Sequence, residues 1–271
     1  MKQSIIEMID QVKQKQPLIH NITNQVVMNF TANGLYALGA LPIMAHERLE
    51  VAEIATQSDA LVLNIGTLTD ELLEAMIIAG RAANQKGIPI VFDPVGVGAT
   101  KFRTRAANRL LSELEINLIR GNAAEISHLA GLKADVRGVD ALTRLNGEMV
   151  IRQSIEELKI PIVMTGKTDF IADQATIIKL TNGSALLTKV TGAGCLLSSI
   201  VAAFLAVSQS NILAPTAAVS YFTIAAEKAA EKAKSSGQFQ IALLDALCEV
   251  TATDLNKRLQ IEKVSVDGRE F

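Results

Sequence analysis

A glycine-rich turn ending in a cysteine is the segment of this sequence best suited to chemistry on a phosphate. It reads Val-Thr-Gly-Ala-Gly-Cys over residues 190–195 and leads into an apolar segment of small residues. Gly192 and Gly194 reach backbone angles that other residues avoid, and they let an anion approach the main chain. A helix beginning near Cys195 would aim unpaired N–H groups and its positive dipole end at the same place. The turn, with Ala193 between the glycines, is therefore predicted to hold a nucleotide phosphate; a simple strand-to-helix turn is the alternative.

Cys195 stands where a helix usually carries a hydroxyl or carboxylate cap. A free thiol titrates near about 8.5, and a helix N-terminus lowers that pKa. Cys195 is thus expected to be partly a thiolate that accepts a proton from a substrate alcohol. A buried, inert cysteine is the alternative, and it is the interpretation we adopt for Cys248, which lies in the apolar pattern of the last helix.

Two carboxylates follow predicted strands, and the first of them, Asp93, is a candidate for a magnesium site. Asp93 precedes a proline and a glycine-rich loop, and Glu125 lies in Gly-Asn-Ala-Ala-Glu. Carboxylate oxygens are ligands that Mg²⁺ accepts, often through water. Each also has a structural alternative, since Asp before Pro initiates turns and Asn122 with Glu125 matches a capping box.

Arg120 and Thr165 each end a predicted strand and are followed by a glycine. A guanidinium at the carboxyl edge of a sheet suits a phosphate oxygen, and a threonine hydroxyl next to a glycine suits a nucleotide. A surface salt bridge is the alternative for Arg120.

The elements that must position these residues are short apolar runs alternating with helical patterns. Strands are predicted at residues 42–45, 60–65, 88–93, 117–120 and 161–165, and helices at 25–38, 47–56, 70–86, 103–114, 123–130 and 148–158. This alternation predicts a parallel, doubly wound sheet. Ligands gather beyond the carboxyl ends of such strands, so the polar residues that follow the strands are expected to meet at one edge.

The pattern changes after residue 168. Residues 169–190 predict a meander of three short strands, with Asn182-Gly183 as a turn signal. Beyond the glycine turn the chain is predicted to be helical to about residue 259, with breaks near 208–215 and 235–237. Because no linker or repeat interrupts the sequence, residues 1–271 are expected to form a single domain.

Composition and charge argue against several classes of protein. The chain has 271 residues, of which 49% are hydrophobic but only 4% aromatic, a mixture typical of helices packed on a buried parallel sheet. A net charge of −2 favours neither nucleic acid nor an anionic membrane. The first residues read as an amphipathic helix rather than a signal peptide, and no apolar run is long enough to span a membrane. The two cysteines match neither a disulfide framework nor a metal site, so a cytoplasmic protein is expected.

The β meander followed by Gly-Ala-Gly and a helix resembles the ribokinase-like kinases, which usually carry Asp where this chain has Cys195. A cysteine at that position resembles the hydroxyethylthiazole kinase family. The stretch PLIHNITNQVVMNFTANGLYALGALPIMAHE, residues 17–47, is similar to the N-terminal signature of that family, and FDPVGVGAT, RGNAAEI and VMTGKTD are similar to its other motifs. The resemblance covers essentially the whole chain.

The resemblance implies an α/β, ribokinase-like fold with a mostly parallel central sheet and helices on both faces. It also implies ATP-dependent phosphorylation of the hydroxyl group of 4-methyl-5-(2-hydroxyethyl)thiazole, in thiamine biosynthesis. Mg²⁺ is then expected at Asp93 and Glu125, and ATP at Arg120, Asn122 and Thr165. Catalysis is assigned to Cys195 with the turn residues Gly192, Ala193 and Gly194. A homotrimer with its sites between subunits is implied as well.

Substrate contacts are expected at Asn24, Met44, Gly66, Thr67 and Gly192. A helix N-cap is the structural alternative for Asn24, and core packing is the alternative for Met44. The three histidines show no ligand spacing and are predicted to be structural.

Two other functions stay open on the sequence. A kinase for hydroxymethylpyrimidine or pyridoxal would share the fold, but the cysteine in place of Asp and the N-terminal stretch argue against it. A non-catalytic ligand sensor on a kinase scaffold is contradicted by the intact set of Asp93, Arg120, Glu125 and the glycine turn.

Overall fold

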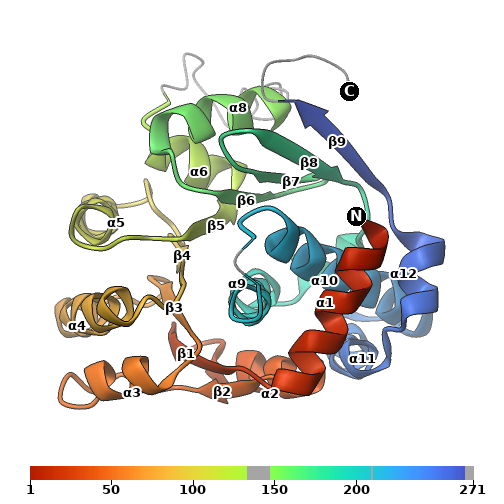
Figure 1. Ribbon diagram of the computed structural model, residues 1–271, viewed down its shortest axis with the longest axis horizontal. Helices are drawn as coiled ribbons and strands as arrows, with labels where there is room; N and C mark the ends of the chain where they lie inside the picture. Colours follow the sequence, from red (N-terminus) through yellow and green to blue (C-terminus); the bar gives the residue numbers. More distant parts are fainter. Residues whose placement is uncertain (133–146, 209, 266–271) are drawn as a thin grey trace.

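The computed structural model describes residues 1–132, 147–208 and 210–265. In this part of the chain one sheet has the strand order β2-β1-β3-β4-β5-β6-β7-β8-β9 (Figure 1). The strands are β1 (Leu18–Ile22), β2 (Leu41–Ile43), β3 (Ala60–Asn64), β4 (Ile90–Asp93), β5 (Leu118–Asn122), β6 (Ile162–Thr165), β7 (Asp169–Ala172), β8 (Thr176–Leu180) and β9 (Ile261–Ser265). All pairs from β2 to β6 are parallel, whereas those from β6 to β9 are antiparallel. The predicted α/β fold with a mostly parallel sheet is confirmed.

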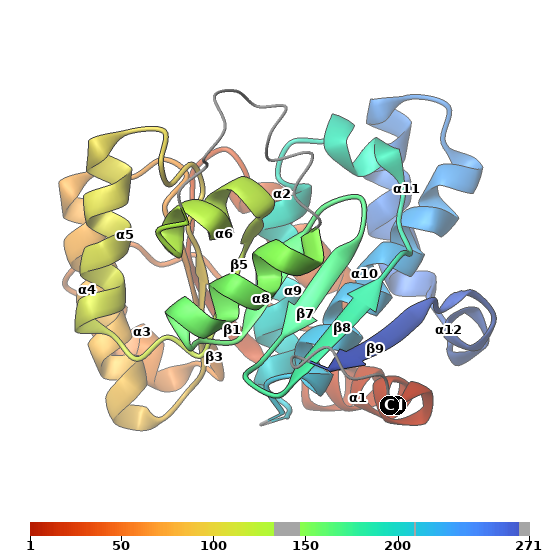
Figure 2. The same cartoon turned by 90° about the horizontal axis from the view of Figure 1, so that it is seen from above.

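Helices cover both faces of the sheet, as predicted. One face carries α3 (Val51–Gln57), α4 (Asp70–Lys86), α5 (Lys101–Glu113), α6 (Ala123–Leu129) and α8 (Gly147–Leu158), and the other carries α1 (Lys2–Lys15), α2 (Met28–Leu38), α9 (Ala193–Leu205), α10 (Leu213–Lys232), α11 (Ser236–Glu249) and α12 (Ala252–Arg258). Figures 1 and 2 show the sheet between these two groups. Each face has its own aliphatic core.

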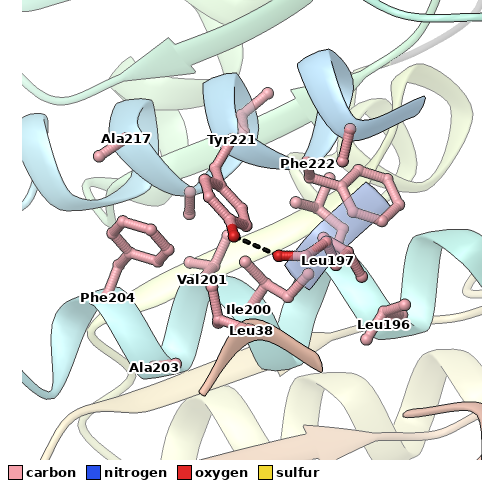
Figure 3. Close-up of a cluster of buried hydrophobic side chains, with 14 of the residues drawn as sticks. Leu38, Leu196, Leu197, Ile200, Val201, Ala203, Phe204, Ala217, Tyr221 and Phe222 are labelled. Carbon is pink, nitrogen blue, oxygen red and sulfur yellow. Dashed lines mark hydrogen bonds between the residues drawn. The ribbon is translucent and has the colours of Figure 1, made fainter. Parts of the chain in front are cut away.

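Helix α9 is the element that places the glycine turn. It contacts β1, β3 and β4 on one side and α10 on another, and Figure 1 shows it on the concave side of the sheet. Eleven of its residues are buried, which explains its nearly continuous apolar and small-residue sequence. Figure 3 shows its side chains meeting those of α10, where the Tyr221 hydroxyl donates a hydrogen bond to the main-chain carbonyl of Leu247. The N-terminus of α9 is thereby fixed at the carboxyl edge of the sheet.

Strand β1 was not among the predicted strands. Its centre is polar, but both polar residues are buried with partners. His20 Nε2 bonds the carbonyl of Ala45 at 2.9 Å, and Asn21 accepts from Ser199 Oγ at 2.6 Å. Because polar groups with hydrogen-bond partners can be buried, the strand forms without an alternating apolar pattern, although His20 Nδ1 has no partner among the described residues.

The prediction of a third strand in the meander is wrong. Residues 169–172 and 176–180 form strands, but Ala185–Lys189 is a 3₁₀ helix, η1, whose N-cap Ser184 accepts from Leu186 N. The edge of β8 is instead paired with β9, beyond the predicted helical region. Helix α9 also begins earlier than predicted, at Ala193.

In the part of the chain with a described structure, no helix is long and apolar enough to cross a membrane.

Candidate active site

A network of hydrogen bonds joins residues from four distant parts of the chain at the carboxyl edge of the sheet. Asn24 Nδ2 donates to Asn64 Oδ1 at 3.0 Å and lies 3.4 Å from Cys195 Sγ. Asn64 Nδ2 donates to Asp93 Oδ2 at 2.8 Å, and Ser198 Oγ donates to the same oxygen at 2.8 Å. The structure therefore brings together the predicted site residues Asn24, Asp93 and Cys195. It also gives a function in the network to Asn64 and Ser198, for which the sequence suggested no role.

The glycine turn is shaped for close contacts. Gly192 has a φ of 89° and forms the N-cap of α9, and a Cβ there would lie 2.6 Å from Val27 Cγ1. A Cβ on Gly194 would lie 2.5 Å from Arg120 Nη1. The first glycine is thus needed for its backbone conformation, and the second allows the guanidinium to approach the start of the helix.

Cys195 is a neutral thiol in this structure, so the expected thiolate is wrong. Burial, with a smaller contribution from the neighbouring charge of Asp93, raises the pKa of Cys195 to about 11, and the hydrogen bonds and Arg120 oppose this rise. Desolvation of the charged form outweighs the helix N-terminus on which the sequence argument relied.

Asp93 is fully buried and is the acidic residue at the centre of the network. Burial raises its pKa to about 6, opposed by Arg120 and by the hydrogen bonds from Ser198 and Asn64. Arg120 Nη1 lies 3.9 Å from Oδ2, whereas Oδ1 has no hydrogen-bond partner among the described residues. A buried carboxylate oxygen without a partner fits a cation or the water bound to one.

Glu125 forms the capping box that the sequence offered as its structural alternative. Asn122 Oδ1 accepts from Glu125 N at 2.9 Å, and Glu125 Oε2 accepts from Asn122 N at 2.9 Å. Glu125 Oε1 accepts from Gly96 N at 2.9 Å. Both carboxylate oxygens thus bind main-chain N–H groups, and Glu125 joins α6 to the loop after β4.

The described residues contain no cluster of three or more His, Cys, Asp or Glu side chains arranged to hold a metal. A cation here would depend on Asp93 and on oxygens supplied by its ligand or by water.

A pocket of about 710 Å³ opens beside the N-terminus of α9. Arg120, Asn122 and Thr165 line one side, as the ATP assignment requires, and Gly194 lines the floor. Arg120 Nη2 donates to Thr165 Oγ1 at 2.7 Å, which couples two of these strand ends. Leu197 of α9 and Phe222 of α10 supply apolar surface. The volume lies within the range usual for cofactor-sized ligands.

The loops that follow β3 and β4 are held by an arginine that sequence reasoning missed. Arg103 on α5 donates to the carbonyls of Ile65 at 3.0 Å, Gly66 at 2.6 Å and Val95 at 2.5 Å. No motif signalled it, because its partners are main-chain atoms set by the fold.

The predicted substrate residues are only partly brought together. Gly66 N donates to Asn64 Oδ1 at 3.0 Å, and a Cβ on Gly66 would lie 2.8 Å from Asn24 Nδ2. Thr67 Oγ1 accepts from Gln25 N at 3.1 Å, next to Asn24. Met44 follows β2 and is half-buried. Its carbonyl oxygen lies 3.3 Å from His46 Nδ1, and His46 Nε2 lies 3.2 Å from the carbonyl of Thr23, the residue before Asn24. Asn24 does not cap α2, whose N-cap is Val27.

Comparison with known proteins finds one matching family model and similar solved structures. Residues 9–253 match the family model described as the hydroxyethylthiazole kinase family. The chain is similar to a hydroxyethylthiazole kinase from Pyrococcus horikoshii OT3, with 40% identity and a TM-score of 0.89 over 96% of this chain and 98% of the other.

More distant structures share the fold. A ribokinase-like superfamily protein from Enterococcus faecalis V583 is 14% identical, with a TM-score of 0.63 over 93% of this chain and 95% of the other. The pyridoxal kinase from Staphylococcus aureus in complex with AMP-PCP is also 14% identical, with a TM-score of 0.63 over 92% and 98%. The ribokinase-like fold implied by the sequence is confirmed.

Proposed function

The chain belongs to the hydroxyethylthiazole kinase family, and on this premise we propose that it transfers the terminal phosphoryl group of ATP to the hydroxyl of 4-methyl-5-(2-hydroxyethyl)thiazole at the N-terminus of α9. The observation that carries the site assignment is the convergence of three features. The nucleotide-sized pocket, the glycine turn and the buried Asp93 network all meet where Gly194 contacts Arg120.

The protein's part in the reaction is mainly positioning and charge stabilisation. Phosphoryl transfer passes through a loose transition state whose charge is spread over the transferred oxygens. Arg120 and the unpaired amides at the start of α9 neutralise that charge. Thr165 holds the Arg120 guanidinium against the pocket through its 2.7 Å hydrogen bond.

Cys195 orients the acceptor rather than acting as an anionic base. Its thiol is neutral at physiological pH, and a loose transition state requires little proton removal before the phosphorus–oxygen bond forms. The hydroxyl proton then leaves to an oxygen of the transferred phosphoryl group or to water as that bond forms. A protonated sulfur beside Asn24 and the glycine turn can receive and direct the alcohol group by hydrogen bonding.

Mg²⁺ fits the site through Asp93, whose buried Oδ1 has no hydrogen-bond partner in the part of the chain that the structure describes. Glu125 fits an indirect role, because its oxygens hold the loop after β4. When bound, the cation neutralises phosphate charge and orients the phosphates of the donor.

A homotrimer with acceptor sites between subunits agrees with one feature of the chain. Large apolar side chains are exposed on α2, at Tyr36, and on β2, at Leu41, which Met44 follows in the sequence. A partner subunit that covers this face would complete the acceptor site. We place the protein in the cytoplasm, where its phosphoryl donor ATP is available.

The test is ATP-dependent phosphorylation across a panel of small alcohols by the purified protein. The thiazole alcohol should be the preferred acceptor, with ADP released only when an acceptor is present. Preferred turnover of hydroxymethylpyrimidine or pyridoxal would overturn the substrate assignment, and ligand binding without ADP release would favour a sensor.

A further inference from the structure

One wall of the nucleotide pocket is a loop that no motif in the sequence assigned to binding. Residues 181–184 follow β8 and line the pocket with Thr181, Asn182, Gly183 and Ser184. Gly183 has a φ of 137°, a backbone conformation that favours glycine. The loop therefore requires a support that fixes its conformation.

That support is Glu227 on α10. Glu227 Oε1 accepts from Asn182 Nδ2 at 2.9 Å and from Gly183 N at 3.0 Å. Glu227 lies one helical turn beyond Thr223, which itself lines the pocket. A single carboxylate oxygen thus attaches the loop to the helix that forms another part of the pocket.

Asn182 extends the attachment to the C-terminal part of the chain. Its side chain is buried, with Nδ2 also donating to Arg258 O at 2.8 Å and Oδ1 accepting from Gln260 N at 2.7 Å. Both partners lie beyond residue 253, where the match to the family model ends. Since these contacts occupy the Asn182 amide, the loop offers the ligand mainly its main chain and the neighbouring side chains.

We propose that Glu227 is a positioning residue for the phosphoryl donor: by fixing residues 181–184 it preorganises the nucleotide pocket and sets the affinity for ATP. The inference rests on the proposed function, because it takes ATP as the occupant of the pocket. A wall held in place before binding loses less conformational freedom when the ligand arrives. The hydrogen bonds described for Glu227 go to Asn182 and Gly183 and not to the acceptor network, so the acceptor should bind independently of it.

The experiment compares E227A, E227Q and E227D with the matched control E231A. Glu231 lies one turn further along α10 and pairs with Arg258 at 2.7 Å, the same guanidinium that lies 3.9 Å from Glu227 Oε2. E231A therefore removes a partner of Arg258 while keeping the hydrogen bonds from Glu227 to the loop. E227A should raise KM for ATP and the Kd for Mg·ATP in calorimetry about tenfold, the effect of losing a charged hydrogen-bond acceptor. kcat and KM for the thiazole alcohol should change less than about twofold.

The conservative variants separate positioning from general destabilisation. E227Q keeps an acceptor oxygen at the same reach and should bind ATP within about twofold of wild type, whereas E227D, which withdraws the oxygen, should weaken binding severalfold even if E227A fails to fold. Equal weakening by E231A, or wild-type affinity in E227A and E227D, would overturn the inference. Absence of ATP binding by the wild-type protein would overturn the proposed function itself.

Discussion

The cysteine at the helix start shows how two effects compete at a single residue. The helix N-terminus favours a thiolate, but enclosure of the sulfur beside Asp93 raises its pKa to about 11. Desolvation wins because the thiolate would lose its water without gaining a full counter-charge. The residue type and position were visible in the sequence, whereas its protonation state depended on burial, which the sequence does not specify.

Replacing Cys195 by Ser tests the orienting role. A serine oxygen is smaller than sulfur and lies closer to its Cβ, so it reaches less far toward the acceptor. C195S should therefore leave the acceptor less well aligned. We expect ATP affinity to stay within about twofold while kcat falls by about 100-fold, the lower end of the effects of misplaced catalytic groups. Single-turnover assays with calorimetric ATP titrations provide the measurement.

The matched control is C248S. The predicted burial of Cys248 is wrong, because this cysteine is exposed on α11, and it lies outside the site. Wild-type turnover in C195S would remove the sulfur from the mechanism. An equal loss in C248S would point to a general effect of removing cysteines.

The residues that touch one another across the site were harder to predict than the residues that follow strands. Arg120, Asn122 and Thr165 share the pocket because the parallel strands end at one edge of the sheet. The pattern of strands in the sequence was enough to predict this grouping. Asn64 and Ser198 join the Asp93 network through the packing of α9 on β3 and β4, which periodicity does not reveal.

At the scale of elements, predictions failed where side-chain partners rather than periodicity determine the conformation. Strand β1 has a polar centre that local propensity assigns to a loop, and long-range partners bury it. Residues 185–189 have the apolar character of a strand but form a 3₁₀ helix, because β9 occupies the edge of β8. By contrast, helix α4 has the predicted bounds, since a regular apolar pattern runs between its Thr69 cap and Gly87.

The burial of a histidine in β1 makes stability depend on pH. Burial lowers the pKa of His20 to about 4, with His46 adding to the effect and the Ala45 hydrogen bond opposing it. Because the unfolded chain binds this proton at about 6.5 and the folded chain only near 4, the contribution is fully present above pH 6.5. This stabilisation is lost as the pH falls from 6.5 through 4, and the loss reaches about 2 kcal/mol at pH 4.5.

Urea unfolding of wild type and H20Q at pH 7.5 and pH 4.5 measures the contribution of His20 to the free energy of unfolding. Glutamine can still donate to Ala45 O but cannot titrate, so wild type should lose about 2 kcal/mol more than H20Q between the two pH values. Taking the difference removes the contributions of Asp93 and Asp169, whose pKa values are raised to about 6 in both proteins. Parallel pH profiles would show that His20 is not buried as a neutral group.

At the scale of the whole molecule, the two ends of the sheet differ in what covers them. The β9 end carries the antiparallel strands beside the nucleotide pocket. At the other end, β2 pairs with β1 alone among the described strands, and large apolar side chains are exposed nearby: Val26 at 68%, Tyr36 at 61%, Leu41 at 40% and Leu49 at 94%. Exposed apolar groups gathered on one end mark an interaction surface, and a second copy of the chain is the partner that the proposed trimer requires.

Light scattering after size exclusion tests that assembly together with catalysis. Wild type should have three times the 29.0 kDa chain mass, whereas Y36E, which places a charge on this surface, should have a smaller mass and a raised KM for the thiazole alcohol. Its affinity for ATP should stay within about twofold, because Tyr36 is not among the residues that line the nucleotide pocket. M149E changes an equally exposed apolar residue on α8, at the opposite side of the molecule in Figure 1, and should leave mass and kinetics unchanged. A monomeric wild type with full activity would show that Met44 and Cys195 serve the acceptor without a partner subunit.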